Sequence, residues 1–333
     1  MYLAITVDTE ADDQWSRPSP RTVRNLAGLS RMQTMCESLG VPPTYLITSE
    51  VAASAQKMPE VVEATARNAA EIGAHLHPWT TPPFDPEESG TPADEVHTMP
   101  SELASDLLRM KMVTLTAEVA EILGRGPTAF RAGRFGMSQA VANVLAELGY
   151  LVDSSVTPGI DWHGRSDTGR RGGIPDYSSW SPEPAEIEME QGHRLVEIPV
   201  TILNVRGYHP TGRAKKGSRA LATRSVRGLV GRARGSHVWC RPWPGYTRET
   251  LPLLWDTAKN QGLPAVVMMF HSSELVPGCS PYRSSADDVD DLFAQVETFV
   301  RHALADGAAP ATLSSCAEQL RRADVLASRR LDS

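Results

Sequence analysis

Ionisable side chains of the kinds used in catalysis and metal binding stand at or just after the ends of several short apolar segments. They are Asp8 and Glu10, His75 and His77, Arg131, Asp153 and His271. A buried ionisable group is costly unless it is paired or bound to a metal, so core packing alone does not explain this repeated placement. If the apolar segments are parallel strands, their ends meet on one face and these side chains converge there.

The segment His75-Leu76-His77 places two imidazoles on the same side of an extended chain, because side chains alternate with a period of two in a strand. Alone, such a pair is more often a pair of ordinary core or surface histidines than a metal site. Asp8-Thr9-Glu10, at another strand end, supplies the carboxylate that a site with two histidines and one carboxylate requires. The combination predicts a divalent metal, zinc in the first place, with cobalt, nickel, manganese or iron as alternatives.

Strand and helix periodicities alternate along the chain. Strands are expected at residues 2–7, 44–48, 71–76, 128–131, 151–153, 195–200, 265–270 and 311–313, and helices at 21–39, 59–70, 101–123, 138–149, 247–260 and 286–304. This alternation predicts an α/β fold, a distorted (β/α)7–8 TIM-like barrel with its chemistry at the carboxyl ends of the strands. We expect residues 1–333 to form a single catalytic domain, with an irregular and basic insertion at about 157–245.

Composition excludes some classes of function. A net charge of −7 and a pI near 5.8 argue against a dedicated nucleic-acid binder, which needs a basic surface to displace counterions. The four cysteines are far apart in sequence, which indicates reduced thiols. The first residues lack the pattern of a signal peptide, and the longest apolar run, 263–270, is too short for a membrane span of about 20 residues. We therefore expect a cytoplasmic protein without a transmembrane segment.

Five segments, in this order, resemble the motifs of the polysaccharide deacetylases, the family that shares the NodB homology domain. They are residues 6–10 (TVDTE), 71–79 (EIGAHLHPW), 130–136 (FRAGRFG), 153–155 (DSS) and 270–275 (FHSSEL). The resemblance extends from residue 2 to about residue 320. It implies a distorted barrel and a metal-dependent hydrolase that removes an acetyl group from the amide nitrogen of a sugar or glycan-like substrate.

The resemblance also implies roles for the strand-end residues. Asp8 would be the general base, and Arg131 would hold that carboxylate ionised through a bidentate contact. His271 would protonate the leaving amine and, while charged, stabilise the oxyanion. Asp153 would orient His271 or Arg131. Arg131 and Asp153 could instead form a simple buried ion pair that ties strands together.

This chain departs from the family pattern at two positions. The family carries two adjacent carboxylates, a base and then a metal ligand, whereas Thr9 separates Asp8 from Glu10 here. The ligand role is therefore inferred for Glu10, with Asp12 or Asp13 as alternatives. The family spaces its ligand histidines four positions apart, but position 79 is Trp79, so His77 is the inferred second histidine ligand.

Several residues are candidates for contacts with substrate. Trp79, beside the histidines, and Tyr282, in the loop after His271, could stack on a sugar face, and Arg134 is a further candidate. No acidic residue lies between Glu197 and Glu249, although ten Arg and Lys residues lie between 206 and 241. That basic segment is either a solvated insertion or a contact for a phosphate or nucleotide on the sugar, or for a lipid headgroup.

Two other functions remain open. An amidohydrolase-type barrel that cleaves a C–N bond in a small molecule also uses a His-x-His pair. There, however, the pair typically ends the first strand, where this chain has Asp8 and Glu10. A glycan-binding relative that has lost its metal would explain the altered histidine spacing. Nothing in the sequence indicates the oligomeric state.

Overall fold

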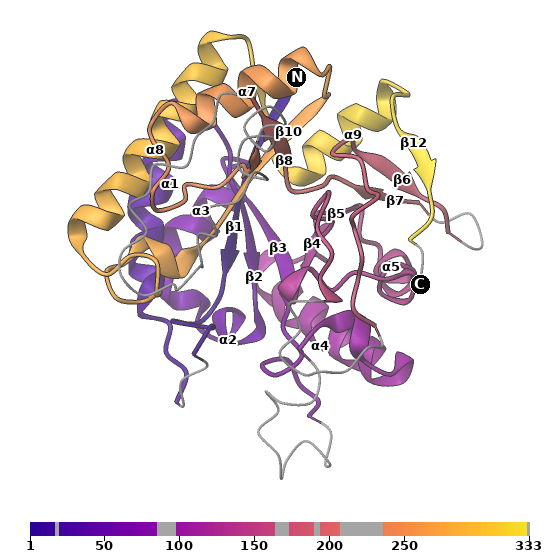
Figure 1. Cartoon of the computed structure of the whole chain (residues 1–333). Coiled ribbons are helices and arrows are strands. Elements are labelled where there is room, and N and C mark those ends of the chain that lie inside the picture. The colour runs from indigo at the N-terminus through magenta and orange to yellow at the C-terminus, as the bar shows by residue number, and fades with distance from the viewer. Residues whose placement is uncertain (17–19, 85–97, 164–172, 190–193, 207–235, 332–333) are drawn as a thin grey trace, which may run out of the picture.

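The computed structural model describes residues 1–16, 20–84, 98–163, 173–189, 194–206 and 236–331. Among these residues, one large sheet contains β1 (Tyr2–Thr9), β2 (Thr44–Ile47), β3 (Glu71–Leu76), β4 (Ala129–Ala132), β5 (Val152–Asp153), β6 (Ala185–Ile187), β7 (Leu195–Glu197), β10 (Ala265–His271), β11 (Ala309–Pro310) and β12 (Ala327–Arg329). The strand order is β10-β1-β2-β3-β4-β5-β7-β6-β12, and β11 pairs with β1. Figure 1 shows the central strands running side by side, with helices on the outside.

The strands from β10 to β7 pair in parallel, so their carboxyl ends lie on one face. The register sets Asp8 beside His271 and His75 beside Arg131. Every residue of β2, β3 and β4 is buried, as expected for a parallel sheet that is covered on both sides. The parallel sheet therefore brings together side chains that are far apart in the sequence.

The chain that follows β7 reaches across to β10, the strand at one edge of the sheet. Val200 donates its N–H to the carbonyl of Val156, 3.0 Å away, and Thr201 donates to Val267 of β10, 3.3 Å away. A two-stranded antiparallel sheet, β8 (Ile202–Val205) with β9 (Ser236–Trp239), continues from this bridge. The predicted distorted (β/α) barrel is thus confirmed. The described part of the insertion at 157–245 is less irregular than expected, because it contributes β6, β8 and β9 besides the strand expected at 195–200, which is β7.

The helices are α1 (Leu29–Leu39), α2 (Ser49–Ala52), α3 (Pro59–Ala66), α4 (Ser105–Leu123), α5 (Gln139–Glu147), α7 (Thr250–Asn260), α8 (Ala286–Ala305) and α9 (Leu313–Arg322). In Figure 1, α1, α3 and α8 cover one side of the strands, and α4 and α5 lie on the other. Among the described residues, none of the helices is both long enough and apolar enough to cross a lipid bilayer.

The strand expected at residues 311–313 is wrong in its position. The strand is β11, at Ala309–Pro310, and Leu313 already begins α9. The reason is the Thr312 side chain, which accepts a hydrogen bond from the Ser315 N–H and caps the helix. The apolar and β-branched residues 311–313 are typical of a strand, but the cap formed by Thr312 places Leu313 at the start of a helix.

Candidate metal centre and catalytic groups

Three of the predicted ligand residues form a compact buried cluster at the carboxyl ends of β1 and β3. Nε2 of His77 lies 2.9 Å from Nε2 of His75 and 3.2 Å from Oε2 of Glu10. Nε2 of His75 lies 3.7 Å from Oε2 of Glu10. Ligand atoms at about 2.0–2.2 Å from a tetrahedral ion are roughly 3.3–3.6 Å apart, so small adjustments would seat a divalent metal. Each of the three residues is 4% exposed or less, so their polar atoms are shielded from solvent.

The surroundings of His75 suit it as a ligand. Its Nδ1 lies 2.9 Å from the carbonyl oxygen of Arg131, so Nδ1 carries the proton and Nε2 keeps its lone pair for the cluster. Burial would lower the pKa of His75, but the charges of Asp8 and Glu10 outweigh it and raise that pKa above its ordinary value. The same negative potential favours a cation at this point.

The position of Glu10 settles which carboxylate belongs to the cluster. Its backbone is fixed by hydrogen bonds to Ser272 and Asn25. Asp12 acts elsewhere, because its carboxylate accepts hydrogen bonds from Thr22, Arg24 and Asn25 and thereby folds the loop after β1. Burial would raise the pKa of Asp12, but these hydrogen bonds lower it. Within the described chain, the three-residue cluster that could hold an ion contains neither Asp12 nor Asp13.

Asp8 is held by the predicted guanidinium. Nη1 of Arg131 lies 2.6 Å from Oδ1 of Asp8, and both residues are almost fully buried. Burial would raise the pKa of Asp8, but the positive charge of Arg131, with smaller contributions from His75 and His271, lowers it below its ordinary value. Arg131 is itself fixed, because Nε and Nη2 donate to the carbonyl and hydroxyl oxygens of Ser154. Asp8 therefore stays ionised in a position from which it can accept a proton.

Asp153 supports Arg131 through the turn that follows β5. Its carboxylate accepts hydrogen bonds from the N–H and hydroxyl of Ser155, and the Ser155 oxygen accepts from the N–H of Ala132. Glu197 is its neighbour in register on β7. Burial raises the pKa of both carboxyl groups, Glu197 the more strongly. Among the described residues Asp153 forms no ion pair with Arg131, and another carboxylate contacts His271, so orientation of Arg131 is the role that the contacts favour.

That carboxylate is Glu274, which the sequence analysis did not identify. Its Oε1 lies 3.2 Å from Nδ1 of His271 and 2.7 Å from Nη2 of Arg241. Burial would raise the pKa of Glu274, but Arg241 and His271 lower it to about 2. The ionised carboxylate therefore fixes the orientation of the imidazole. The only sequence signal was the spacing of three residues in the segment 270–275, which a short 3₁₀ helix, η8 (Ser272–Leu275), turns into a contact.

Trp79 is placed differently from the expectation of an open stacking surface. It is 3% exposed, its ring centroid lies 4.3 Å from that of His77, and its Nε1 donates to Gln14 at 3.2 Å. Gln14 in turn donates to Glu50 at 3.0 Å. Trp79 thus packs against the candidate ligand His77 and offers no open ring face to a sugar.

The other two predicted substrate contacts border the site. Tyr282 packs against Trp15, with ring centroids 4.8 Å apart, and Trp15 in turn lies 4.9 Å from His271. Arg134 has a φ of 52° in the turn directly after β4. It follows Gly133, where a Cβ would lie 2.4 Å from the carbonyl oxygen of Leu76 and 2.6 Å from the ring of His77. Only glycine lets this turn approach the histidine so closely.

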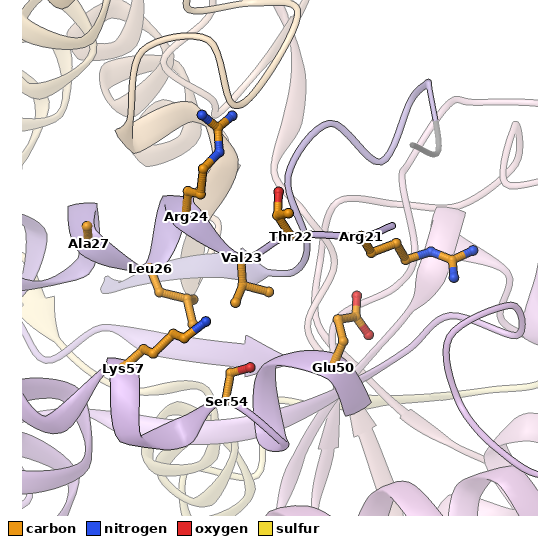
Figure 2. A pocket seen from close by; sticks show the side chains of 9 residues that line it. All are labelled: Arg21, Thr22, Val23, Arg24, Leu26, Ala27, Glu50, Ser54 and Lys57. Carbon is orange, nitrogen blue, oxygen red and sulfur yellow. The ribbon is translucent and has the colours of Figure 1, made fainter. Parts of the chain in front are cut away.

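A pocket of about 550 Å³ lies beside the site (Figure 2). Its lining residues are Arg21, Thr22, Val23, Arg24, Leu26, Ala27, Glu50, Ser54 and Lys57. Glu50 connects it to Gln14 and Trp79, but the metal-cluster residues do not line it. Figure 2 shows the side chains of Arg21 and Arg24 directed away from that of Lys57, so these cations do not converge on one point.

Most of the basic segment predicted at 206–241 lies outside the described residues. Arg241, at its end, has a defined place: its guanidinium binds Glu274 and lies over the rings of Trp243 and Tyr282, 4.5 and 5.0 Å from their centroids. One of the ten cations is therefore built into the site. The proposed role of the others in binding an anionic substrate remains a prediction.

No protein-family model matches the sequence, and no curated protein matches it either. Solved structures do match. A proposed polysaccharide deacetylase from Mycobacterium smegmatis is 19% identical with a TM-score of 0.54, over 99% of this chain and 94% of that one. A proposed glycoside hydrolase/deacetylase from Parabacteroides distasonis is 14% identical with a TM-score of 0.61, over 96% of this chain and 71% of that one. PuuE allantoinase is 13% identical with a TM-score of 0.51, over 96% of this chain and 89% of that one.

Identities this low are informative about architecture alone. Two of these three structures are described as deacetylases, and each match covers almost the whole of this chain. The chain therefore has the distorted (β/α) barrel fold of the polysaccharide deacetylase structures, as its five ordered motifs predicted.

Proposed function

We propose that this protein is a metal-dependent hydrolase that removes an acetyl group from the amide nitrogen of a sugar-like substrate. One observation carries the proposal. The cluster of Glu10, His75 and His77 lies on the same barrel face as an Asp8 held ionised by Arg131 and a His271 held by Glu274. Amide hydrolysis needs a group that accepts a proton and a group that donates one, and this face supplies both.

Glu10, His75 and His77 would hold the ion, zinc being the first expectation for such a donor set. When bound, a divalent metal polarises a carbonyl and makes water more acidic. Asp8 accepts the proton of the attacking water, because Arg131 keeps its carboxylate ionised and pointed into the site. His271 gives a proton to the departing nitrogen, while Glu274 holds its ring in place and offsets its charge.

The test is hydrolysis by the purified protein. We expect acetate release from N-acetylglucosamine oligomers or from sugar nucleotides that carry an acetamido group. Activity should be lost after chelation and restored by added zinc, cobalt, nickel, manganese or iron. Elemental analysis should find one divalent ion per chain. A protein that retains no metal and releases no acetate would instead fit the lapsed, glycan-binding alternative.

The substrate's charge is a separate part of the proposal. Ten cations without an intervening acid would focus a positive field on one side of the cleft. Apparent KM for an anionic acetamido sugar should then rise with salt, whereas KM for a neutral oligomer should not. If the triple substitution of Lys215, Lys216 and Arg219 by alanine leaves KM unchanged for both, the segment is a solvated insertion.

Hydrolysis of a C–N bond in a small molecule is the second candidate. It is supported by the allantoinase among the structures that share the fold. Glu10, His75 and His77 are each 4% exposed or less, and such a buried site is more accessible to a small molecule than to a polymer. Turnover of allantoin without acetate release from any acetamido sugar would favour this candidate.

A further inference from the structure

Trp15 is an exposed aromatic residue at the edge of the candidate site. It follows Glu10 by five positions in the loop after β1 and is 40% exposed. Its ring centroid lies 4.9 Å from that of His271 and 4.8 Å from that of Tyr282, and both pairs are nearly perpendicular, at 76° and 83°. The indole is thus in contact with the candidate acid on one side and remains open to solvent.

The backbone that carries Trp15 is tied down before and after it. Asp13 donates its N–H to the carbonyl of Cys279, 2.7 Å away, and its own φ of 45° turns the chain sharply. Gln14 is hydrogen-bonded to both Glu50 and Trp79. Asp12 accepts a hydrogen bond from the N–H of Asn25, further along the chain. A ring on such a frame is preorganised, so less freedom is lost when a ligand packs on it.

The indole of Trp15 packs against a cluster of aromatic rings, Tyr282 and Trp243. Tyr282 packs on Trp243 with centroids 4.9 Å apart, and the guanidinium of Arg241 lies over both of these rings. Arg241 also binds Glu274, the carboxylate that holds His271. Arg241 therefore contacts both the aromatic cluster and the carboxylate that holds His271, which fixes the position of the rings relative to His271.

We propose that Trp15 is the stacking surface for the flat, apolar face of the ring that carries the leaving nitrogen. The argument rests on the proposed function, through the role of His271 as proton donor. A donor must come within about 2.6–3.2 Å of the nitrogen, so the carbon framework of the leaving group lies beside the imidazole and hence beside the indole. A pyranose presents a face of C–H groups to such a ring, whereas an acyclic amine does not. Trp15 would therefore select leaving amines that present such a face over acyclic amines.

Binding of the amine product tests the surface independently of turnover. In an Asp8→Asn background, the affinity for chitotriose is measured by calorimetry. We expect Trp15→Ala to weaken binding about five- to ten-fold, the scale of one aromatic contact, and Trp15→Phe to restore most of it. Leu253→Ala, at an exposed apolar position on the outer helix α7, is the matched control and should change nothing. Unaltered affinity in Trp15→Ala would overturn the proposal.

Kinetics separate stacking from simple shielding of His271. With tri-N-acetylchitotriose, Trp15→Ala should raise KM about five- to ten-fold and leave kcat within about three-fold. With ethyl acetate, whose leaving group has no ring, kcat/KM should stay within about two-fold. An equal loss on both substrates would mean that the indole only shields the imidazole. Wild-type protein that binds chitotriose but hydrolyses neither substrate would refute the proposed function while leaving the stacking surface in place.

Discussion

Nδ1 of His271 lies 3.2 Å from Oε1 of Glu274, a carboxylate three positions further along the same chain. The register of the sheet makes this contact useful, because it sets His271 at the end of β10 beside Asp8 at the end of β1. The candidate base and the candidate acid are thereby held on adjacent strands, each by a charged partner. Arg131 holds the carboxylate, and Glu274 holds the imidazole.

Glu274→Gln should slow acetate release by about 10²-fold or more, the lower end of the range for positioned proton transfer. The neutral amide is a weaker hydrogen-bond acceptor than the carboxylate, so it holds the Nδ1–H of His271 less firmly and the ring is less well placed to give its proton. The control is Glu297→Gln, at a half-exposed position on α8 whose ion pair is with Arg301. An unchanged rate of acetate release in Glu274→Gln would show that the carboxylate only stabilises the turn.

Arg131→Lys should move the acid limb of the profile to higher pH. Arg131 lowers the pKa of Asp8 against the effect of burial, and an ammonium cannot reproduce the guanidinium contacts with both Asp8 and Ser154. A raised pKa leaves Asp8 protonated, and unable to act as a base, over a wider range of acidic pH. The profile of kcat/KM is the measurement. If its acid limb keeps its position, a group other than Asp8 controls that limb.

His75→Ala should abolish metal retention, since it removes one of the three ligand atoms of the cluster. Glu10→Gln should weaken retention strongly, whereas Asp8→Asn should keep the metal and lose nearly all turnover. Asp13→Asn is the control, because Asn tolerates the positive φ of that position. The metal content of all four variants is measured by elemental analysis after gel filtration. Metal lost from Asp8→Asn but kept by Glu10→Gln would exchange the roles of the two carboxylates.

The sequence predicted the parallel strands and the residues at their ends, because apolar runs that stop at ionisable residues reflect both burial and register. It could not predict how those residues are supported. Glu274 reaches His271 only because η8 turns the chain back after β10. Trp79 was a candidate to stack on a sugar, yet it is buried and its Nε1 donates to Gln14. Such contacts depend on loop conformation, on which hydrophobic periodicity carries no information.

Lys111 is a last example of support that lies far from the ligands in sequence. It is fully buried in α4, and its ammonium donates to the carbonyl oxygens of Pro78, Thr81 and Pro83 at 2.9, 2.8 and 2.8 Å. These residues form the loop directly after His77. Prolines lack an N–H, so this loop has few backbone donors with which to hold itself together.

Lys111→Met keeps the length and apolar stem of the side chain but leaves three carbonyl groups without their donor. We expect metal affinity to fall about ten-fold or more, the usual effect of removing support behind a ligand, because His77 is no longer held at its place in the cluster. Competition with a chromogenic chelator measures this at a temperature where both proteins are folded. Lys57→Met, at an exposed position, is the matched control. If Lys111→Met lowers Tm but leaves metal affinity unchanged, the ammonium stabilises the fold without positioning the ligand.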